Sequence, residues 1–397
     1  VACLLWPIVA SALANEEPWI ERPDLQEFAA NRAAHPVLKG VVNLDLPPEQ
    51  RWDSIISAHK SQVQDVMEYL KGFIPKWLQP LFFSAMRDVI SYKGFPDDYR
   101  AEMQSIAKAM GVDVALVLMG NLLYELENIG VKCPEWNNTG PCTDHPNYVA
   151  STHEIFPFRN LRGADSKPGP RGLCTSVVAE DSSGVMWHGR DLDWDLPGKL
   201  RTLLIDVQYQ RGGKTVFVGS GLVGYVGVLT AMRPGAYSWS LNARDHGGRT
   251  WENFLDALRS HGIPAAMKTR QVFETVADYA GAVKALSSGS TINGAYFTMA
   301  GAEAGQGVVI TRGRDKADDT WPVNASEPEG WYRLQTNYDH WKPVPPMDDR
   351  RKPGYALMNA LHASGLNHDS LARVMHTWPV FNTHTDFTAI MNPRTGL

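Results

Sequence analysis

The sequence predicts an α+β fold in which β-sheets pack face to face and helices lie outside them. Three observations support this fold class. Apolar residues recur at helical spacing between residues 53 and 129, short alternating segments follow residue 174, and helical and strand stretches then succeed one another. Runs of strands and helices in this order are typical of a layered domain.

The composition is that of a chain that folds around a core. Of 397 residues, 44% are hydrophobic and 20% are charged, which excludes disorder as the main state. The formal net charge of −5 gives no reason to expect nucleic acid as a partner. No apolar run reaches the ~18 residues that a spanning helix needs, so a multi-span membrane protein is also excluded.

The first residues have the pattern of a secretory signal. Residues 2–14 (ACLLWPIVASALA) are apolar and uncharged and end in Ala12-Leu13-Ala14, a small-x-small cleavage site. We expect residues 1–14 to be a signal peptide whose charged start is missing. The alternative is a buried N-terminal helix.

Cysteines and sequons favour the same compartment. Cys133 and Cys142 bracket a short polar loop and can close a local disulfide, which leaves Cys174 as a reactive thiol or a mate for another chain. Asn137 and Asn324 each begin an Asn-x-Ser/Thr acceptor for glycosylation. We therefore expect the lysosome or secretion.

The half before residue 174 is predicted to be mostly helical. A strand at 41–46 ends at Pro47 and Pro48, and the helical spacing then predicts helices at 53–72, 99–110 and 113–129. Between the first two helices an apolar cluster is formed by Trp77, Leu78, Leu81, Phe82 and Phe83. This cluster is either helix core or a face that docks on a membrane or lipid substrate surface.

The pattern changes after the loop at 166–172, which is rich in proline and glycine. Strands are predicted at 176–179, 186–189, 203–210, 215–218, 226–231 and 237–241. Helices at 251–261 and 267–286, strands at 296–300, 307–311 and 331–336, helices at 351–363 and 368–377, and a strand at 387–391 complete the chain.

Several familiar motifs are absent or lack their context. Gly219 to Gly224 fit G-x-G-x-x-G, but the next residues read as a strand, whereas a dinucleotide site needs a helix there. The sequence has no H-E-x-x-H, paired C-x-x-C or G-x-S-x-G, so zinc hydrolase and serine esterase sites are unsupported.

Cys174 is the remaining candidate for chemistry. It stands at the start of a predicted strand, and Arg190 and Asp193 follow 16 and 19 residues later, which is enough for one hairpin to return beside it. A chain cut before Cys174 would give that residue a free α-amine of pKa near 7.7–8.0, able to act as base for its own thiol. On spacing alone, a half-buried cysteine with a surface ion pair is the more ordinary interpretation.

Longer motifs around these residues carry a resemblance. Cys174–Asp181 with His188–Asp193 behind it resembles the cleavage site of the acid ceramidase and N-acylethanolamine acid amidase family, which are N-terminal nucleophile cysteine hydrolases related to bile salt hydrolases and penicillin V acylases. The likeness spans nearly the whole mature chain and continues at 42–45, 51–52, 74–77, 224–227, 309–312, 335–343 and 348–351. Residues 337–343, 244–245 and 251–253 are more similar to the amidase branch than to the ceramidase branch.

The resemblance implies the αββα sandwich of N-terminal nucleophile hydrolases with a mostly helical small subunit. It implies a precursor that cuts itself between Leu173 and Cys174 into an α subunit, 15–173, and a β subunit, 174–397, which stay together as a heterodimer. The expected reaction is lysosomal hydrolysis of fatty acid ethanolamides, such as palmitoylethanolamide, to fatty acid and ethanolamine through a Cys174 thioester. No metal or organic cofactor is implied.

The same resemblance assigns roles to single residues. Cys174 is the nucleophile and its freed amine the base, while Arg190 and Asp193 orient that amine near the scissile carbonyl. Asn337 donates to the oxyanion, and Arg350 completes the charged network. Asn242 matches an asparagine that assists the oxyanion in relatives.

Two positions depart from the family pattern. Trp194 stands where Tyr or Phe is expected and, with Asp193, is predicted to line the substrate pocket; Ala243 stands where relatives carry Glu. The alternative activity is that of an acid ceramidase. A non-catalytic lipid-binding or activator protein is a more distant alternative, because it leaves Cys174 without a purpose. At acidic pH the protonated histidines and the apolar cluster are expected to favour an anionic membrane surface.

Overall fold

The computed structural model describes residues 37–127, 174–194, 201–244, 262–344 and 348–397, apart from residues 73, 75, 78, 92–93 and 383. The predicted signal peptide, the cysteines 133 and 142, Asn137, Leu173 and the helix predicted at 251–261 lie outside this range.

The larger sheet forms the centre of the molecule. In the described residues it has eight strands in the order β1-β4-β5-β6-β7-β8-β9-β10, with β1 parallel to β4 and every other neighbour antiparallel. The strands are β1 (Leu38–Asn43), β4 (Leu204–Arg211), β5 (Lys214–Leu222), β6 (Thr230–Arg233), β7 (Tyr237–Ala243), β8 (Ala295–Gly301), β9 (Gly307–Arg312) and β10 (Ala317–Pro322).

A smaller sheet lies against one face of the larger one. Its order is β11-β2-β3-β12, all antiparallel, and its strands are β11 (Tyr332–Gln335), β2 (Thr175–Glu180), β3 (Met186–Asp193) and β12 (Thr385–Met391). Part of the interface is apolar, with Val178 and Met186 packed against Tyr296 and Val309. The rest is polar and carries the candidate site.

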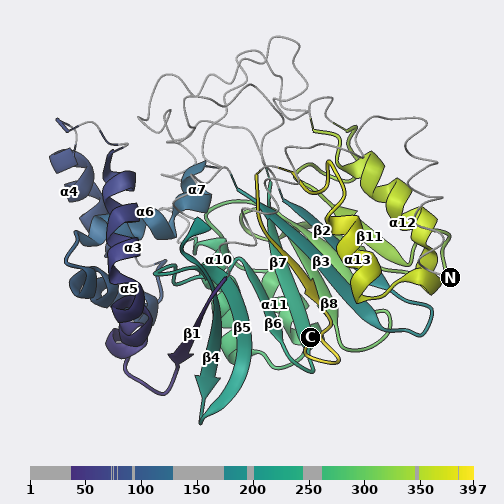
Figure 1. The fold of residues 1–397 in the computed structure, drawn as a ribbon, viewed down its shortest axis with the longest axis horizontal. Helices are drawn as coiled ribbons and strands as arrows, with labels where there is room; N and C mark the ends of the chain where they lie inside the picture. Colours follow the sequence, from purple (N-terminus) through teal and green to yellow (C-terminus); the bar gives the residue numbers. More distant parts are fainter. Residues whose placement is uncertain are drawn as a thin grey trace.

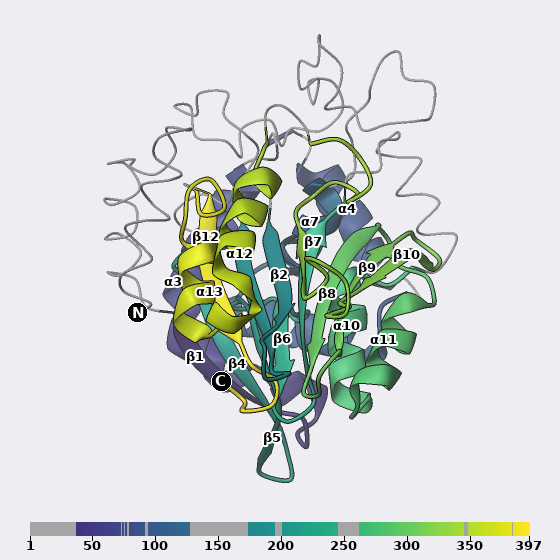
Figure 2. The same cartoon turned by 90° about the vertical axis from the view of Figure 1, so that its right-hand side faces the viewer.

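Helices cover the outer faces of both sheets (Figures 1 and 2). On the larger sheet α10 (Ala265–Thr275) packs on β5 and α11 (Tyr279–Ser287) on β8. On the smaller sheet α12 (Arg351–Gly365) and α13 (His368–Met375) cover β11, β3 and β12. This arrangement is the predicted αββα sandwich.

The helices that precede residue 128 gather at the β1 end of the larger sheet, on the flank opposite α12 and α13 (Figure 1). After the short 3₁₀ turn η1 (Pro48–Gln50) they are α3 (Asp53–Gly72), α4 (Gln79–Ile90), α5 (Asp97–Met110), α6 (Val114–Asn121) and α7 (Leu123–Glu127). Glu102 on α5 joins this group to the sandwich, because its buried carboxylate accepts hydrogen bonds from Arg51, Trp52 and Arg270. Among the described residues, none of the helices has both the length and the apolar character to cross a membrane.

Several predicted elements have other boundaries in the structure. The first strand covers 38–43 rather than 41–46, since the chain turns directly after Asn43. The helix predicted at 267–286 is two helices, because the chain is extended at Val276 and Asp278 then caps α11 by accepting from the main-chain nitrogen of Gly281. Similarly, the segment 113–129 breaks at Leu122 into α6 and α7.

Two predictions of strands were incomplete. The strand expected at 226–231 begins only at Thr230, and residues 223–229 connect β5 to β6 through a turn in which Gly224 has a φ of 84°. No strand was predicted at Ala317–Pro322, whose polar sequence ADDTWP forms the edge strand β10 with alternating burial. Because an edge strand exposes one side to water, its pattern lacks the apolar signal of a central strand.

Candidate active site

Cys174 lies directly before β2, at the end of the interface between the two sheets. The β2–β3 hairpin pairs Thr175 with Asp191 and Ser176 with Arg190, so the chain returns beside the cysteine as its spacing predicted. The Sγ atom of Cys174 lies 3.8 Å from the main-chain oxygen of Asp193, and the residue is only 6% exposed. The hairpin therefore brings a buried thiol next to the main chain of Asp193, whose side chain is also buried.

Asp193 sits at the end of β3 with its side chain inside the protein. Its Oδ2 accepts hydrogen bonds from Asn382 at 2.8 Å and from Arg350 at 3.4 Å, whereas Oδ1 has no partner among the described residues. Burial raises the pKa of Asp193 above its usual value, and the positive charge of Arg350 opposes this effect. A carboxylate with one unengaged oxygen beside Cys174 is suited to hold an amine.

Arg350 connects the other polar groups of the site. Its guanidinium binds both carboxylate oxygens of Asp348, at 2.7 and 2.8 Å, and also donates to Thr175 Oγ1 at 3.2 Å and Asn337 Oδ1 at 2.9 Å. Burial alone lowers the pKa of Arg350, but Asp348 and Asp193 outweigh it and raise the pKa, so the side chain is charged. The forked arrangement of five N–H groups in arginine allows these contacts at once.

Asn337 is oriented from both ends of its amide. Its oxygen accepts from Arg350, and its Nδ2 donates to the main-chain oxygen of Ala243 at 2.9 Å. The second hydrogen of Nδ2 meets no acceptor among the described residues. Asn337 thus has a fixed orientation and an N–H group to donate. Ala243 contributes its main-chain carbonyl to this contact. Its side chain is a methyl group, so the carboxylate of the glutamate expected at this position is missing.

Asn242 has a different environment from the one expected. Its Nδ2 donates to three main-chain carbonyls, those of Cys174 at 3.2 Å, Gln335 at 2.9 Å and Thr336 at 3.2 Å. Both amide hydrogens are therefore engaged, and none is left for an oxyanion. In this geometry Asn242 holds the main-chain carbonyl of Cys174.

Arg190 points between the sheets. Its Nη1 donates to Asn242 Oδ1 at 3.1 Å and to the main-chain oxygen of Asp191, and its Nη2 donates to the main-chain oxygen of Leu241 at 2.6 Å. None of these contacts is with Cys174 or Asp193. Arg190 therefore reaches the predicted site through Asn242.

Two aromatic residues share the main apolar core cluster with Cys174. Trp194 follows β3 directly and is buried in the same apolar cluster as Cys174 and Tyr124. Tyr124 belongs to α7 and donates its hydroxyl to the main-chain oxygen of Gly294 at 2.9 Å. The helical half of the chain thus contributes a side chain to the surroundings of the nucleophile.

The sequence interpretation missed some residues of the site, namely Tyr124, Thr175, Asp348 and Asn382. Asp348 stands two residues from Arg350, and this short spacing of opposite charges was an available signal. No sequence signal pointed to Asn382 or Tyr124, because each is far from Cys174 along the chain and only the fold brings it near.

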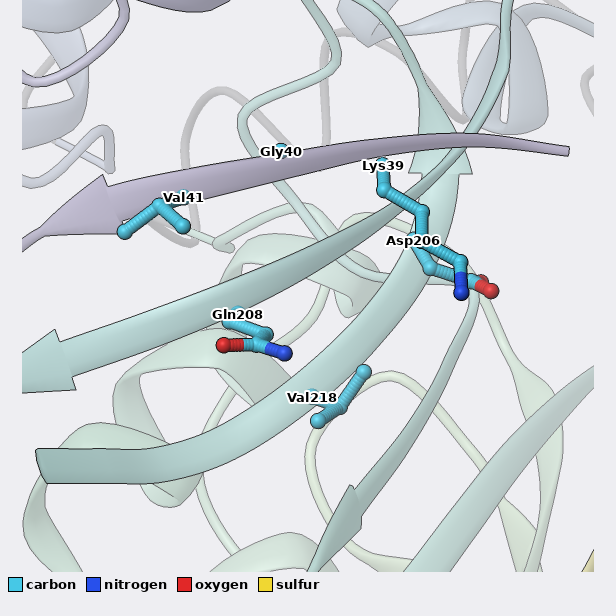
Figure 3. A pocket seen from close by; sticks show the side chains of 6 residues that line it. All are labelled: Lys39, Gly40, Val41, Asp206, Gln208 and Val218. Carbon is cyan, nitrogen blue, oxygen red and sulfur yellow. The ribbon is translucent and has the colours of Figure 1, made fainter.

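One hollow of the described residues lies away from this site. It is an open groove of about 330 Å³ on the part of the larger sheet that the smaller sheet leaves uncovered, lined by Lys39, Gly40, Val41, Asp206, Gln208 and Val218 (Figure 3). These residues belong to β1, β4 and β5, and none of them contacts the site around Cys174. The chemistry is therefore located by side chains and not by this groove.

Comparison with known families matches both halves of the chain. Residues 36–95 match the model of the beta subunit of N-acylethanolamine-hydrolyzing acid amidase, and residues 174–363 match the linear amide C–N hydrolases of the choloylglycine hydrolase family. The second match begins at Cys174.

Curated relatives point the same way. N-acylethanolamine-hydrolyzing acid amidase of Caenorhabditis elegans is 31% identical over 352 residues, 89% of this chain and 88% of that protein. The enzyme of that name from Mus musculus is 30% identical over 353 residues, 88% of this chain and 84% of that protein. Acid ceramidase of Pan troglodytes is 27% identical over 417 residues, 99% of this chain and 93% of that protein.

A solved structure supports the fold. The Caenorhabditis elegans ortholog of N-acylethanolamine-hydrolyzing acid amidase is 36% identical with a TM-score of 0.52, covering 56% of this chain and 94% of that one. Sequence and fold agree: the chain belongs to the N-acylethanolamine-hydrolyzing acid amidase family of linear amide C–N hydrolases.

Proposed function

We propose that this protein hydrolyses N-acylethanolamines, such as palmitoylethanolamide, to a fatty acid and ethanolamine, with Cys174 as the nucleophile. One observation carries the proposal. The residue at which the amide-hydrolase match begins is a buried cysteine at the start of β2, and Asp193 and the Arg350–Asn337 pair lie around it. The names of the relatives supply the substrate class.

Maturation precedes the reaction. The chain is cut between Leu173 and Cys174: Sγ attacks the carbonyl carbon of Leu173, and the peptide nitrogen takes a proton and leaves as the α-amine of Cys174. Water then hydrolyses the thioester to the carboxyl group of Leu173. The products are the chains 15–173 and 174–397, and the buried contact between Glu102 and Arg270 helps hold them together.

Turnover uses the freed amine as base. The thiol proton passes to the α-amine of Cys174 while sulfur attacks the amide carbon of the substrate. The carbonyl oxygen becomes an oxyanion, which Asn337 stabilises through its unengaged N–H. Ethanolamine leaves with the proton and the acyl group stays on Sγ. Water, deprotonated by the same amine, then attacks this thioester, releases the fatty acid and returns a proton to sulfur.

Processing and turnover can be tested together. After incubation at acidic pH, N-terminal sequencing and mass analysis are expected to find a chain that begins Cys174-Thr175-Ser176. Cys174→Ala is expected to leave an uncut chain without amidase activity. An alanine variant that cuts itself at the normal rate would contradict self-cleavage by Cys174.

Acid ceramidase activity is the second candidate, since acid ceramidases align over nearly the whole chain at lower identity. The two substrates share an amide and differ in the amine that leaves. We expect a higher kcat/KM for palmitoylethanolamide than for a ceramide with the same acyl chain, measured in the same detergent. The reverse order would assign the protein to the ceramidases.

The proposed place of action is an anionic membrane surface in the lysosome. Its support is an apolar patch at the start of α4, where Trp77 is 81% exposed and Leu81 is 68% exposed. Phe82 and Phe83, expected in the same cluster, are instead partly buried against the core, and Leu78 lies outside the described residues. Exposed large apolar side chains next to each other are typical of surfaces that dock on lipid.

A further inference from the structure

The polar part of the interface between the sheets is a continuous row of hydrogen bonds. His188 on β3 is fully buried, and its two ring nitrogens lie 2.9 Å from the hydroxyls of Ser238 and Ser240 on β7. Ser240 lies 2.8 Å from the hydroxyl of Ser176 on β2, which in turn lies 2.7 Å from Oδ1 of Asn242. The row ends at the main-chain oxygen of Cys174, 3.2 Å from the Nδ2 of Asn242.

The acceptors in this row determine the direction of every hydrogen bond. Oδ1 of Asn242 can only accept, so Ser176 donates to it. The hydrogen between Ser176 and Ser240 must then come from Ser240. The oxygen of Ser240 consequently accepts from Nε2–H of His188. Because the pKa of His188 is about 3 and the ring is neutral, Nδ1 accepts from Ser238. His188 is thereby required in its Nε2–H form.

Contacts with three carbonyls and with Arg190 prevent the amide of Asn242 from turning over. A rotation of its amide by half a turn would place Oδ1 against the carbonyl oxygens of Cys174, Gln335 and Thr336, and Nδ2 against the guanidinium of Arg190. These four contacts would become repulsions between like groups, whereas the hydroxyl of Ser176, which can donate or accept, would reverse its direction.

We propose that His188, Ser240 and Ser176 are positioning residues that orient the amide of Asn242 and, through it, hold the main-chain carbonyl of the nucleophile. This role rests on the proposed function of Cys174. Once the chain is cut, Cys174 is a chain end and loses the restraint of the residue before it. The carbonyl contact with Asn242 then fixes the backbone from which both the thiol and the α-amine project.

This row of hydrogen bonds, the relay from His188 through Ser240 and Ser176 to Asn242, also stays intact at acidic pH. Burial, together with the neighbouring charge of Arg190, lowers the pKa of His188 to about 3. Tyr296, Thr298 and Ser238 from the larger sheet and Arg190 from its own strand face the same interior. Among the described residues, no carboxylate is a partner of the ring. His188 therefore keeps one neutral form at lysosomal and neutral pH.

The test compares two buried hydroxyl groups that lie opposite each other on the neighbouring strands β7 and β8. Ser240→Ala removes the central link, and Thr298→Val is the matched control: Thr298 pairs with Ser240 across β7 and β8, is fully buried, and its hydroxyl has no partner among the described residues. Self-cleavage before Cys174 and the steady-state hydrolysis of palmitoylethanolamide are measured for both, with thermal unfolding as a check on folding.

We expect Ser240→Ala to slow self-cleavage and lower kcat by about ten-fold, the effect of one lost hydrogen bond, while KM changes by less than about two-fold. Thr298→Val should leave the rate of self-cleavage, kcat and KM within about two-fold of the wild-type values. The proposed relay would be wrong if Ser240→Ala kept the wild-type self-cleavage rate and kcat, or if Thr298→Val lowered them equally. If the wild-type protein cuts itself yet hydrolyses no ethanolamide, the proposed substrate is wrong, and the cleavage rates of the two variants still decide on the relay.

Discussion

Asn337 is a donor whose direction is set before any substrate binds. Arg350 holds its oxygen and Ala243 holds one of its amide hydrogens, so the other hydrogen keeps a constant direction. In its proposed role as oxyanion donor, Asn337 acts on charge that develops in the transition state. Asn337→Ala should therefore lower kcat by roughly a hundred- to a thousand-fold with little change in KM. Steady-state kinetics with palmitoylethanolamide measures both constants. An unchanged kcat would make Asn337 a structural residue.

Arg350 and Asp193 give the site a defined dependence on pH. The charge of Arg350 lowers the pKa of Asp193, whose burial otherwise raises it. Arg350→Gln removes that charge, so the pKa of Asp193 should rise and the acidic limb of kcat/KM should move to higher pH. Arg350→Lys is the matched control: it keeps the charge but loses the fork that reaches Asp348, Asn337 and Thr175, so kcat should fall while the limb stays. An acidic limb of kcat/KM at the same pH in both variants would contradict the effect of the Arg350 charge on Asp193.

Part of the site was predictable from single residues. The spacing from Cys174 to Arg190 and Asp193 is local, and the β2–β3 hairpin realises it. The orientation of Asn242 was not predictable, since it depends on carbonyls contributed by β2 and by the segment after β11. Asn382 reaches Asp193 from 189 residues away, a separation at which no sequence period operates.

At the scale of elements, helix α7 depends on one buried carboxyl group. Glu125 is 1% exposed, and its Oε1 accepts from the main-chain nitrogen of Ala265 at the start of α10. Its Oε2 and the nearby hydroxyl of Tyr225 have no partner among the described residues. Burial raises the pKa of Glu125 from 4.5 to about 7. This carboxyl group is thus neutral at lysosomal pH and charged above neutrality.

The raised pKa of Glu125 makes the folded protein less stable as the pH increases. The unfolded chain ionises Glu125 near pH 4.5 while the folded chain keeps its proton up to about pH 7, so the free energy of unfolding falls between these values by about 3 kcal/mol. Glu125→Gln should remove that part of the slope. Denaturant unfolding at pH 4.5 and 7.5, in the uncut Cys174→Ala chain, measures it. Glu68→Gln on the exposed face of α3 is the control, and a wild-type slope in Glu125→Gln would refute the assignment.

The elements that were predicted best are those with a strong local period. Helix α3 covers the predicted residues 53–72 because its buried side chains, from Ile55 to Leu70, follow the helical repeat closely. The break between α10 and α11 was missed because apolar residues continue across it, and only Asp278 marks the start of the second helix. Parallel pairing of β1 with β4 joins residues more than 160 apart and has no local signature.

At the scale of the whole molecule, charge and the patch on α4 should act together. The formal charge is −5, and protonating all twelve histidines would take it to +7. His188 does not take part, because its pKa of about 3 keeps it neutral, and burial lowers the pKa of His340 as well. An unperturbed imidazole has a pKa near 6.5. The cut protein should therefore bind anionic vesicles more strongly near pH 5 than near pH 7.5.

Vesicle co-sedimentation tests this binding. Trp77→Ser with Leu81→Ser should weaken it, since these side chains are the exposed part of the patch. Phe82→Ser with Phe83→Ser is a comparison at partly buried positions, which should lower stability more than it lowers binding. Equal binding at both pH values, or no loss in the exposed double variant, would contradict the membrane role.

The central claim is that a freed Cys174 carries the acyl group during amide hydrolysis. The most direct measurement is the intact mass of the protein after rapid acid quenching of a reaction with palmitoylethanolamide. We expect a chain of residues 174–397 that carries one palmitoyl group, which hydroxylamine removes and peptide mapping locates on Cys174. Hydrolysis of the substrate by an uncut chain, or by a chain acylated at another residue, would contradict it.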